Sequence, residues 1–154
     1  MKNSRLRTRV AVGAAAVAFI GAFEGLRTTA YRDVVGVPTV CYGETVGVKM
    51  GDRYTVEQCK AMFRASLEKY ALPVERCIKR DMPDTTYIAF VSLSYNIGSG
   101  GFCNSSVARL YNMGRTREAC DYMLNYNKAK RRVFPGLERR RQAERKLCLQ
   151  GAEL

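Results

Sequence analysis

The sequence predicts a protein of the α+β class, with one small antiparallel sheet near the N-terminus and a mainly helical remainder. Strand and turn signals concentrate in residues 28–54, and helical patterns follow to the C-terminus. The chain of 154 residues has the length of a single domain. Hydrophobic residues make up 47% and charged residues 26%, a balance that excludes a largely disordered chain.

The N-terminal segment has the layout of an export signal. Four cations precede an uncharged run from Val10 to Phe23, the order of a basic and a weakly hydrophobic region in secretory signals. As a helix this run spans about 21 Å, less than a hydrocarbon core of about 30 Å. Three interpretations stay open: a cleaved signal peptide, a marginal membrane anchor, and the first helix of the fold. The chain therefore divides into residues 1–23, the signal-anchor or first helix, and residues 24–154, the folded domain.

Residues 28–54 predict the small sheet, because β-branched and aromatic residues are interrupted there by glycines that favour turns. Thr55-Val56-Glu57-Gln58 forms a capping box that opens a helix to about Leu72, where Pro73 should end it. Residues 84–98 are so apolar that little polar face remains. They predict the buried central helix.

Three shorter helices are expected to follow. Gly98-Ser99-Gly100-Gly101 lacks the lysine of a phosphate-binding loop and predicts a helix stop with a tight turn. Ser105 or Ser106 caps the next helix, and Gly114 ends it. The last two helices cover residues 116–127 and, after a break at Pro135-Gly136, residues 137–149.

The charge is strongly positive: 26 lysines and arginines against 14 acidic residues give +12. Such a protein favours nucleic acid, anionic lipid or the acidic bacterial envelope. The basic C-terminal region lacks a helix-turn-helix frame and interleaved aromatics, so we expect a solvated basic face and no nucleic-acid partner. Its cations are Lys128, Lys130, Arg131, Arg132, Arg139, Arg140, Arg141, Arg145 and Lys146.

The sequence contains no histidine, which excludes His-based triads, His zinc sites and acid–base catalysis by His. We expect no metal and no cofactor. The cysteines are widely spaced and form no Cys-x-x-Cys pair, so they fit three disulfides in an oxidising compartment. The alternative is six buried thiols in a cytosolic protein, and six cysteines allow 15 connectivities. They are Cys41, Cys59, Cys77, Cys103, Cys120 and Cys148.

The densest polar pattern lies between Glu24 and Gly43. Glu24 ends the apolar run, where burial disfavours the charged form of a carboxyl. Asp33 lies at a turn entering the sheet and should stay ionised, and Thr39 can place a hydroxyl beside it. A carboxyl that keeps its proton, a second carboxylate and a hydroxyl that holds water are the groups a glycosidase needs.

Glu24, Asp33 and Thr39 lie in a frame that resembles the phage-type lysozymes, glycoside hydrolase family 24. The resemblance covers about residues 23–149 and includes three later blocks. These blocks are Tyr95-Asn96-Ile97-Gly98, Gly101-Phe102-Cys103-Asn104-Ser105, and Phe134-Pro135-Gly136-Leu137-Glu138-Arg139-Arg140-Arg141 with Glu144. The sequence departs from the family's pattern at two places. Glu44 stands where the family commonly has His, and no Trp lies near Tyr126, where relatives often have one.

The resemblance implies a lysozyme-like fold and a muramidase, in which residues 24–154 form the catalytic domain. Glu24 would be the general acid, while Asp33 and Thr39 hold the attacking water, consistent with inversion. The substrate would be the β-1,4 bond between N-acetylmuramic acid and N-acetylglucosamine in peptidoglycan, bound in part by Tyr95 and Ser105. Among exported relatives, cysteines matching Cys41, Cys59, Cys120 and Cys148 recur, while those matching Cys77 and Cys103 occur together or not at all. The resemblance therefore implies the pairs Cys41–Cys59, Cys77–Cys103 and Cys120–Cys148.

The N-terminus is similar to that of signal-arrest-release endolysins, which are exported on an uncleaved weak anchor and become active on its release. This implies the inner membrane, then the periplasm, as location, with host lysis by a monomer as the outcome. The alternative is a soluble phage lysozyme that needs a membrane pore. Outside this activity, the rival hypotheses are a non-catalytic basic protein that binds membrane or nucleic acid, and a chitin-cleaving relative on the same fold.

Overall fold

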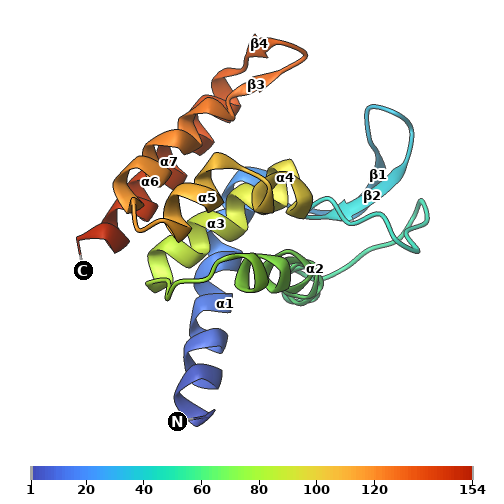
Figure 1. Ribbon diagram of the computed structural model, residues 1–154. Helices are drawn as coiled ribbons and strands as arrows, with labels where there is room; N and C mark the ends of the chain where they lie inside the picture. The colour runs from blue at the N-terminus through green and yellow to red at the C-terminus, as the bar shows by residue number, and fades with distance from the viewer. Residues whose placement is uncertain (1, 154) are drawn as a thin grey trace. The chain divides into compact units, whose positions relative to one another are not determined.

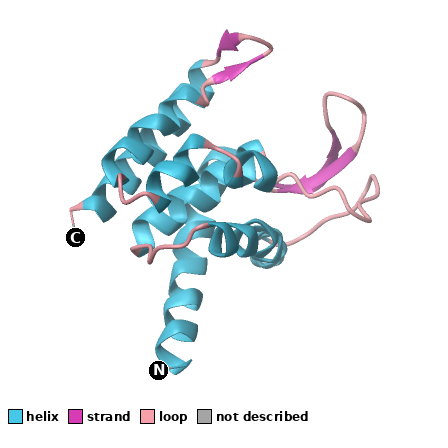
Figure 2. Ribbon diagram, viewed as in Figure 1, coloured by secondary structure: helices cyan, strands magenta, loops and turns pink. Residues whose placement is uncertain are grey.

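The structure is a computed structural model that describes residues 2–153, with side chains from Gly13 onward (Figure 1). The chain forms two compact units that divide after Glu68. The division lies inside helix α2 (Val56–Cys77). Within the described residues, the strands form two antiparallel hairpins, one in each unit (Figure 2).

The first unit begins with helix α1 (Lys2–Glu24), so the apolar run forms a continuous helix. Gly25 ends it with a φ of 71°, a conformation that glycine adopts without a steric penalty. Strands β1 (Arg27–Arg32) and β2 (Pro38–Cys41) form the expected antiparallel sheet. Among the described residues, no helix is both long enough and apolar enough to span a membrane.

The core of this unit is built where α1 approaches α2. A Cβ on Gly21 would lie 3.0 Å from Cε1 of Tyr42 and 3.5 Å from Cε1 of Phe63. The rings of Tyr42 and Phe63 are buried and stacked, with centroids 4.6 Å apart. The bare backbone of Gly21 therefore lets α1 pack against an aromatic pair.

Helix α2 begins as the sequence predicts and ends later. The Thr55 nitrogen donates to Oε1 of Gln58 at 2.8 Å, and the Gln58 nitrogen donates to Oγ1 of Thr55 at 3.1 Å, which confirms the capping box. The prediction that Pro73 ends the helix is wrong. Proline removes one backbone donor, but Val74 beyond it is fully buried and packing carries the helix on to Cys77.

The second unit is built around helix α3 (Asp84–Ile97), the predicted central helix. Eight of its residues are buried, and it packs along helix α7 (Pro135–Ala152). On α3, Phe90 contacts the rings of Phe102 and Tyr111, each with centroids 5.2 Å away. Gly98, with a φ of 91°, ends α3 as expected.

The short helices after α3 follow the sequence prediction only in part. The segment after Gly98 forms the one-turn helix α4 (Ser99–Cys103) instead of a simple turn. Helix α5 (Ser106–Asn112) is capped by Ser105, which settles the choice between the two serines. Helix α6 (Thr116–Tyr122) continues as the 3-10 turn η1 (Met123–Asn125).

The sequence prediction missed a second hairpin, formed by β3 (Lys128–Ala129) and β4 (Arg132–Val133). It extends from the start of α7 (Figure 1). Pro135-Gly136 was expected to break the chain, yet α7 begins at Pro135. Proline is favoured at the first helical position, because its missing N–H has no intrahelical partner there anyway.

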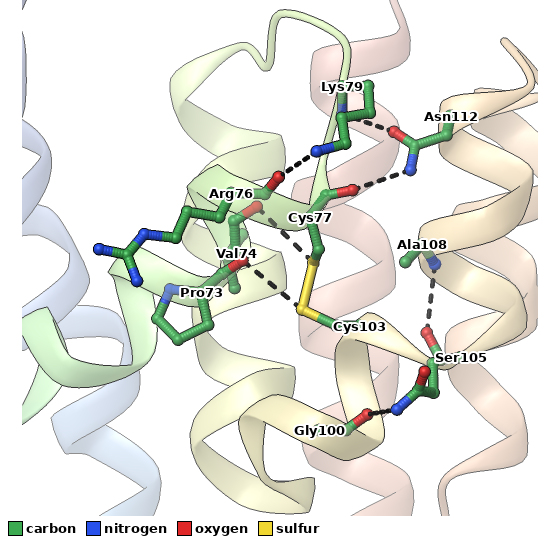
Figure 3. Close-up of a disulfide and its surroundings, with 11 residues drawn as sticks. Pro73, Val74, Arg76, Cys77, Lys79, Gly100, Cys103, Ser105, Ala108 and Asn112 are labelled. Carbon is green, nitrogen blue, oxygen red and sulfur yellow. Dashed lines mark hydrogen bonds between the residues drawn. A yellow bond between two sulfur atoms is a disulfide. The ribbon is translucent and has the colours of Figure 1, made fainter.

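All six cysteines form disulfides, in the pairings that the resemblance implies. Cys41–Cys59 joins the end of β2 to α2 in the first unit. Cys77–Cys103 joins α2 to α4 (Figure 3). Cys120–Cys148 joins α6 to α7, with both cysteines fully buried.

Candidate active site

Glu24 is the last residue of α1 and is half-buried. The nitrogen of Gly25 donates to the Gly21 carbonyl at 3.3 Å, so the helix remains regular up to the glutamate. Strand β1 begins three residues after Glu24, at Arg27. The backbone of Glu24 is thus held by a helix that is itself packed against Tyr42 and Phe63.

Asp33 closes the tight turn between β1 and β2. Its Oδ1 accepts hydrogen bonds from the nitrogens of Val35 and Val37, both at 2.9 Å. Its own carbonyl accepts from the nitrogen of Gly36 at 2.9 Å, and Gly36 has a φ of 85°. Because the carboxylate is the acceptor for two backbone donors, its orientation is fixed by the turn itself.

Thr39 lies on β2, directly opposite Tyr31 of β1. Its hydroxyl donates to the carbonyl oxygen of Val37 at 2.9 Å, and the residue is 4% exposed. The nitrogen of Asp33 donates to the same Val37 oxygen at 3.0 Å. The structure therefore brings Asp33 and Thr39 together on one hairpin, with Glu24 in the same compact unit.

The two residues expected to bind sugar lie in the second unit. Tyr95, near the end of α3, meets Tyr70 of α2 edge to face, with centroids 4.9 Å apart. Ser105 is nearly buried, and its Oγ accepts from the nitrogen of Ala108 at 3.1 Å as the cap of α5 (Figure 3). Ser105 is also hydrogen-bonded to the side chain of Tyr126, whose pKa is raised by burial.

One buried cluster of titratable side chains was not predicted from the sequence. Glu144 is fully buried on α7, with its Oε1 2.6 Å from Nε of Arg141. Its Oε2 accepts from Nη2 of Arg141 at 3.0 Å and from the Ser92 hydroxyl on α3. Nη2 of Arg140 donates to the Ser92 carbonyl at 3.1 Å. Desolvation raises the pKa of Glu144 and lowers that of Arg141.

The sequence carried a partial signal for this cluster. Glu144 and its two arginines belong to the last block of the resemblance. The prediction of a solvated basic face is wrong for Arg140 and Arg141, because α3 packs over this side of α7 and buries both side chains. Glu44, where the family commonly has His, accepts from the Ser66 hydroxyl through both carboxylate oxygens at 3.0 Å, and so joins the segment after β2 to α2. No group of three or more metal-ligating side chains occurs in the described part of the chain.

A small sheet joined to helices around a buried central helix defines a lysozyme-like protein. Comparison with known proteins then gives the family: residues 21–144 match the family model "Phage lysozyme". The chain belongs to the phage lysozyme family and is a glycoside hydrolase with lysozyme activity, whose substrate class is peptidoglycan. The resemblance seen in the sequence is thereby confirmed for family, fold class and enzyme class.

Individual relatives agree with this assignment. The chain is 41% identical to a SAR-endolysin of Pseudomonas phage phiKMV over 147 residues, which is 92% of this chain and 91% of that one. It is 40% identical to a SAR-endolysin of Bacteriophage PS119 over 131 residues, 84% and 78% of the two chains. The solved muramidase domain of SpmX from Asticaccaulis excentricus matches with a TM-score of 0.82 at 34% identity, covering 88% of this chain and 95% of that one.

Proposed function

We propose that the protein is a muramidase that hydrolyses the β-1,4 bond between N-acetylmuramic acid and N-acetylglucosamine, with Glu24 as general acid and Asp33 and Thr39 as the residues that hold the attacking water. The observation that carries this proposal is the shared bonding of Asp33 and Thr39 to the Val37 carbonyl. Val37 thereby binds both residues on one hairpin: its carbonyl accepts from the Asp33 nitrogen and the Thr39 hydroxyl, and its nitrogen donates to the Asp33 carboxylate at 2.9 Å.

The hydrogen-bond directions define what these two groups do to a water. The Thr39 hydroxyl already donates its proton to Val37, so toward a water it acts as an acceptor. The ionised carboxylate of Asp33 is also an acceptor. A water between them donates one hydrogen to each, and its lone pair is free to attack the anomeric carbon.

The proton balance follows from that arrangement. Glu24 transfers its proton to the glycosidic oxygen as the bond from that oxygen to the anomeric carbon breaks. The water oxygen bonds to the same carbon from the opposite face, and Asp33 receives the proton that the water loses. The new hemiacetal has inverted configuration. Before the next turnover Asp33 releases its proton to solvent and Glu24 takes one up, so both groups return to their starting forms.

The test is a lysis assay on permeabilised Gram-negative cells with Glu24→Gln, which keeps the size of the side chain but cannot donate a carboxylic proton. We expect lysis to fall by about 10²- to 10⁴-fold with an unchanged circular dichroism spectrum. Glu57→Gln, an exposed glutamate of the same unit, is the matched control and should lyse normally. Normal lysis by Glu24→Gln would overturn the acid assignment, and product analysis on peptidoglycan and on chitin checks the glycan.

Export on residues 1–23 is also part of the proposal: the segment serves as an uncleaved weak anchor in the inner membrane, and its release places the active monomer in the periplasm. Two relatives that carry the name SAR-endolysin support it. So does the small-residue face of α1, because Gly21 fits against Tyr42 and Phe63 once the helix leaves lipid. Fractionation of cells before and after membrane depolarisation tests whether the protein is anchored and then released. The mass of the released chain shows whether residues 1–23 are still attached.

A further inference from the structure

We propose that the β3–β4 hairpin is a binding site for the acidic peptide stems of peptidoglycan, an inference that rests on the proposed function. The hairpin would hold the stem carboxylates of a bound glycan strand. Its tip and its strands carry four cations and no acidic residue: Lys128, Lys130, Arg131 and Arg132.

The turn of the hairpin has an unusual composition for its geometry. Ala129 pairs with Arg132, so the loop consists of Lys130 and Arg131 alone. Their φ angles are 50° and 66°, both in the left-handed region that a type I′ turn requires. Asn-Gly satisfies that requirement best, and long side chains satisfy it poorly. Strained positions persist at functional sites more often than elsewhere, and here they display two cations at an exposed tip.

Hydrogen bonds tie the hairpin base to the start of α7 and link it to the region of Ser105. The Phe134 nitrogen donates to the Asn127 carbonyl at 3.0 Å, and Nδ2 of Asn127 donates to Oε2 of Glu138 at 2.7 Å. The residue before Asn127 is Tyr126, whose side chain is hydrogen-bonded to Ser105. A glycan strand bound at Ser105, as the family resemblance implies, would therefore carry its stems past the cationic hairpin.

The chemistry of the surface fits a peptide with several carboxylates. Two of the cations are arginines, which bind carboxylates through two parallel hydrogen bonds. Val133 and Phe134 follow them and are 56% and 43% exposed. They offer apolar contact to the methyl and methylene groups that separate the carboxylates of such a stem.

The test uses the full chain with Lys130→Asn and Arg131→Gly together, in the non-cleaving Glu24→Gln background. Asn-Gly is the preferred pair for this turn, so the hairpin keeps its fold and the melting temperature should stay equal or rise. We expect binding to purified sacculi to weaken by about fivefold to thirtyfold at low salt, the effect of losing two exposed ion pairs. Binding to glycan strands freed of stems by an amidase should not change.

The matched control removes the same charge elsewhere in the second unit, by Arg117→Asn and Lys146→Asn, at two exposed positions of α6 and α7. The proposal is overturned if this control weakens sacculus binding as much as the hairpin variant, or if the hairpin variant loses equal affinity for stem-free strands. Loss of binding only to phosphatidylglycerol vesicles would overturn it in favour of a membrane contact. If the parent and both variants bind neither polymer, the proposed function itself fails; equal binding by all three to sacculi refutes the hairpin site alone.

Discussion

Asp33 and Thr39 hydrogen-bond to the same atom, the carbonyl oxygen of Val37, from a backbone nitrogen at 3.0 Å and from a hydroxyl at 2.9 Å. This carbonyl thereby holds the Asp33 backbone and the Thr39 side chain, while the Val37 nitrogen donates to the Asp33 carboxylate at 2.9 Å. The arrangement depends on a turn of four residues after β1, so the catalytic geometry proposed above is local in sequence.

A first prediction concerns the hydroxyl. Thr39→Val keeps the shape of the side chain but removes the water acceptor, and we expect the initial rate of lysis to fall by about 10²-fold, the effect of a poorly placed reactant. Thr39→Ser keeps the hydroxyl and should retain most of the rate. Loss of the bond to Val37 should cost Thr39→Val about 1 kcal/mol of stability. Turbidity assays and thermal melts measure the two effects separately, and equal rates for the two variants would exclude a role for the hydroxyl.

A second prediction compares two glycines of α1. A Cβ on Gly13 would meet only Nε of Arg64, at an ordinary 3.8 Å, whereas a Cβ on Gly21 would lie 3.0 Å from the Tyr42 ring. Gly13→Ala should raise the free energy of unfolding by about 0.5–1 kcal/mol through helix propensity. At Gly21 the same change should bring no gain or a loss, because the ring must shift. Denaturant titrations of both variants check the packing of α1, and identical shifts would contradict it.

A third prediction concerns the buried ion cluster. Glu144→Gln leaves the Arg141 guanidinium buried without its counter-charge, so we expect a loss of about 3–5 kcal/mol in the free energy of unfolding. The control is Arg145→Ala on the same helix. Arg145 pairs with Asp121 at 2.8 Å, but the two side chains are 36% and 56% exposed. That exposed pair should contribute no more than about 1 kcal/mol, and comparable losses from both variants would refute the distinction.

A fourth prediction is a pH dependence at the hairpin base. Hydrogen bonds from Asn127 and Gln142 lower the pKa of Glu138 below its ordinary value. A carboxyl whose pKa is depressed by folding stabilises the native state above its unfolded pKa, and this contribution is lost as pH falls through the folded pKa. Melting temperatures between about pH 5 and pH 3 should therefore fall more steeply for the parent than for Glu138→Gln. Parallel pH profiles would show that these bonds do not matter to stability.

Local signals in the sequence predicted the elements that depend on local physics. The capping box at Thr55 and the glycine stop at Gly98 both lie where the spacing placed them. Pro73 failed as a helix end because the burial of Val74 outweighs one missing backbone bond. The β3–β4 hairpin escaped prediction because its strands are two residues long and its turn lacks the Asn-Gly or Gly-x signature.

In the candidate site, too, some features follow from local sequence and others only from the folded structure. Glu24, Asp33 and Thr39 could be selected from their residue types and from the resemblance, since they lie within one short segment. The hydrogen bonds that orient Asp33 and Thr39 could not be predicted from the sequence, because they depend on the conformation of the turn. The cluster around Glu144 combines residues of α3 and α7 separated by 52 positions, and only tertiary packing identifies it as buried.

The positions of the three cross-links have a consequence for proteolysis. Cys41–Cys59 lies before Glu68, while Cys77–Cys103 and Cys120–Cys148 both lie after it. A single cut in the middle of α2, after the exposed Lys69 for example, would leave no covalent bond between the fragments. A nicked and fully oxidised chain would therefore migrate as two bands on a non-reducing gel, the N-terminal fragment with one disulfide and the C-terminal fragment with two.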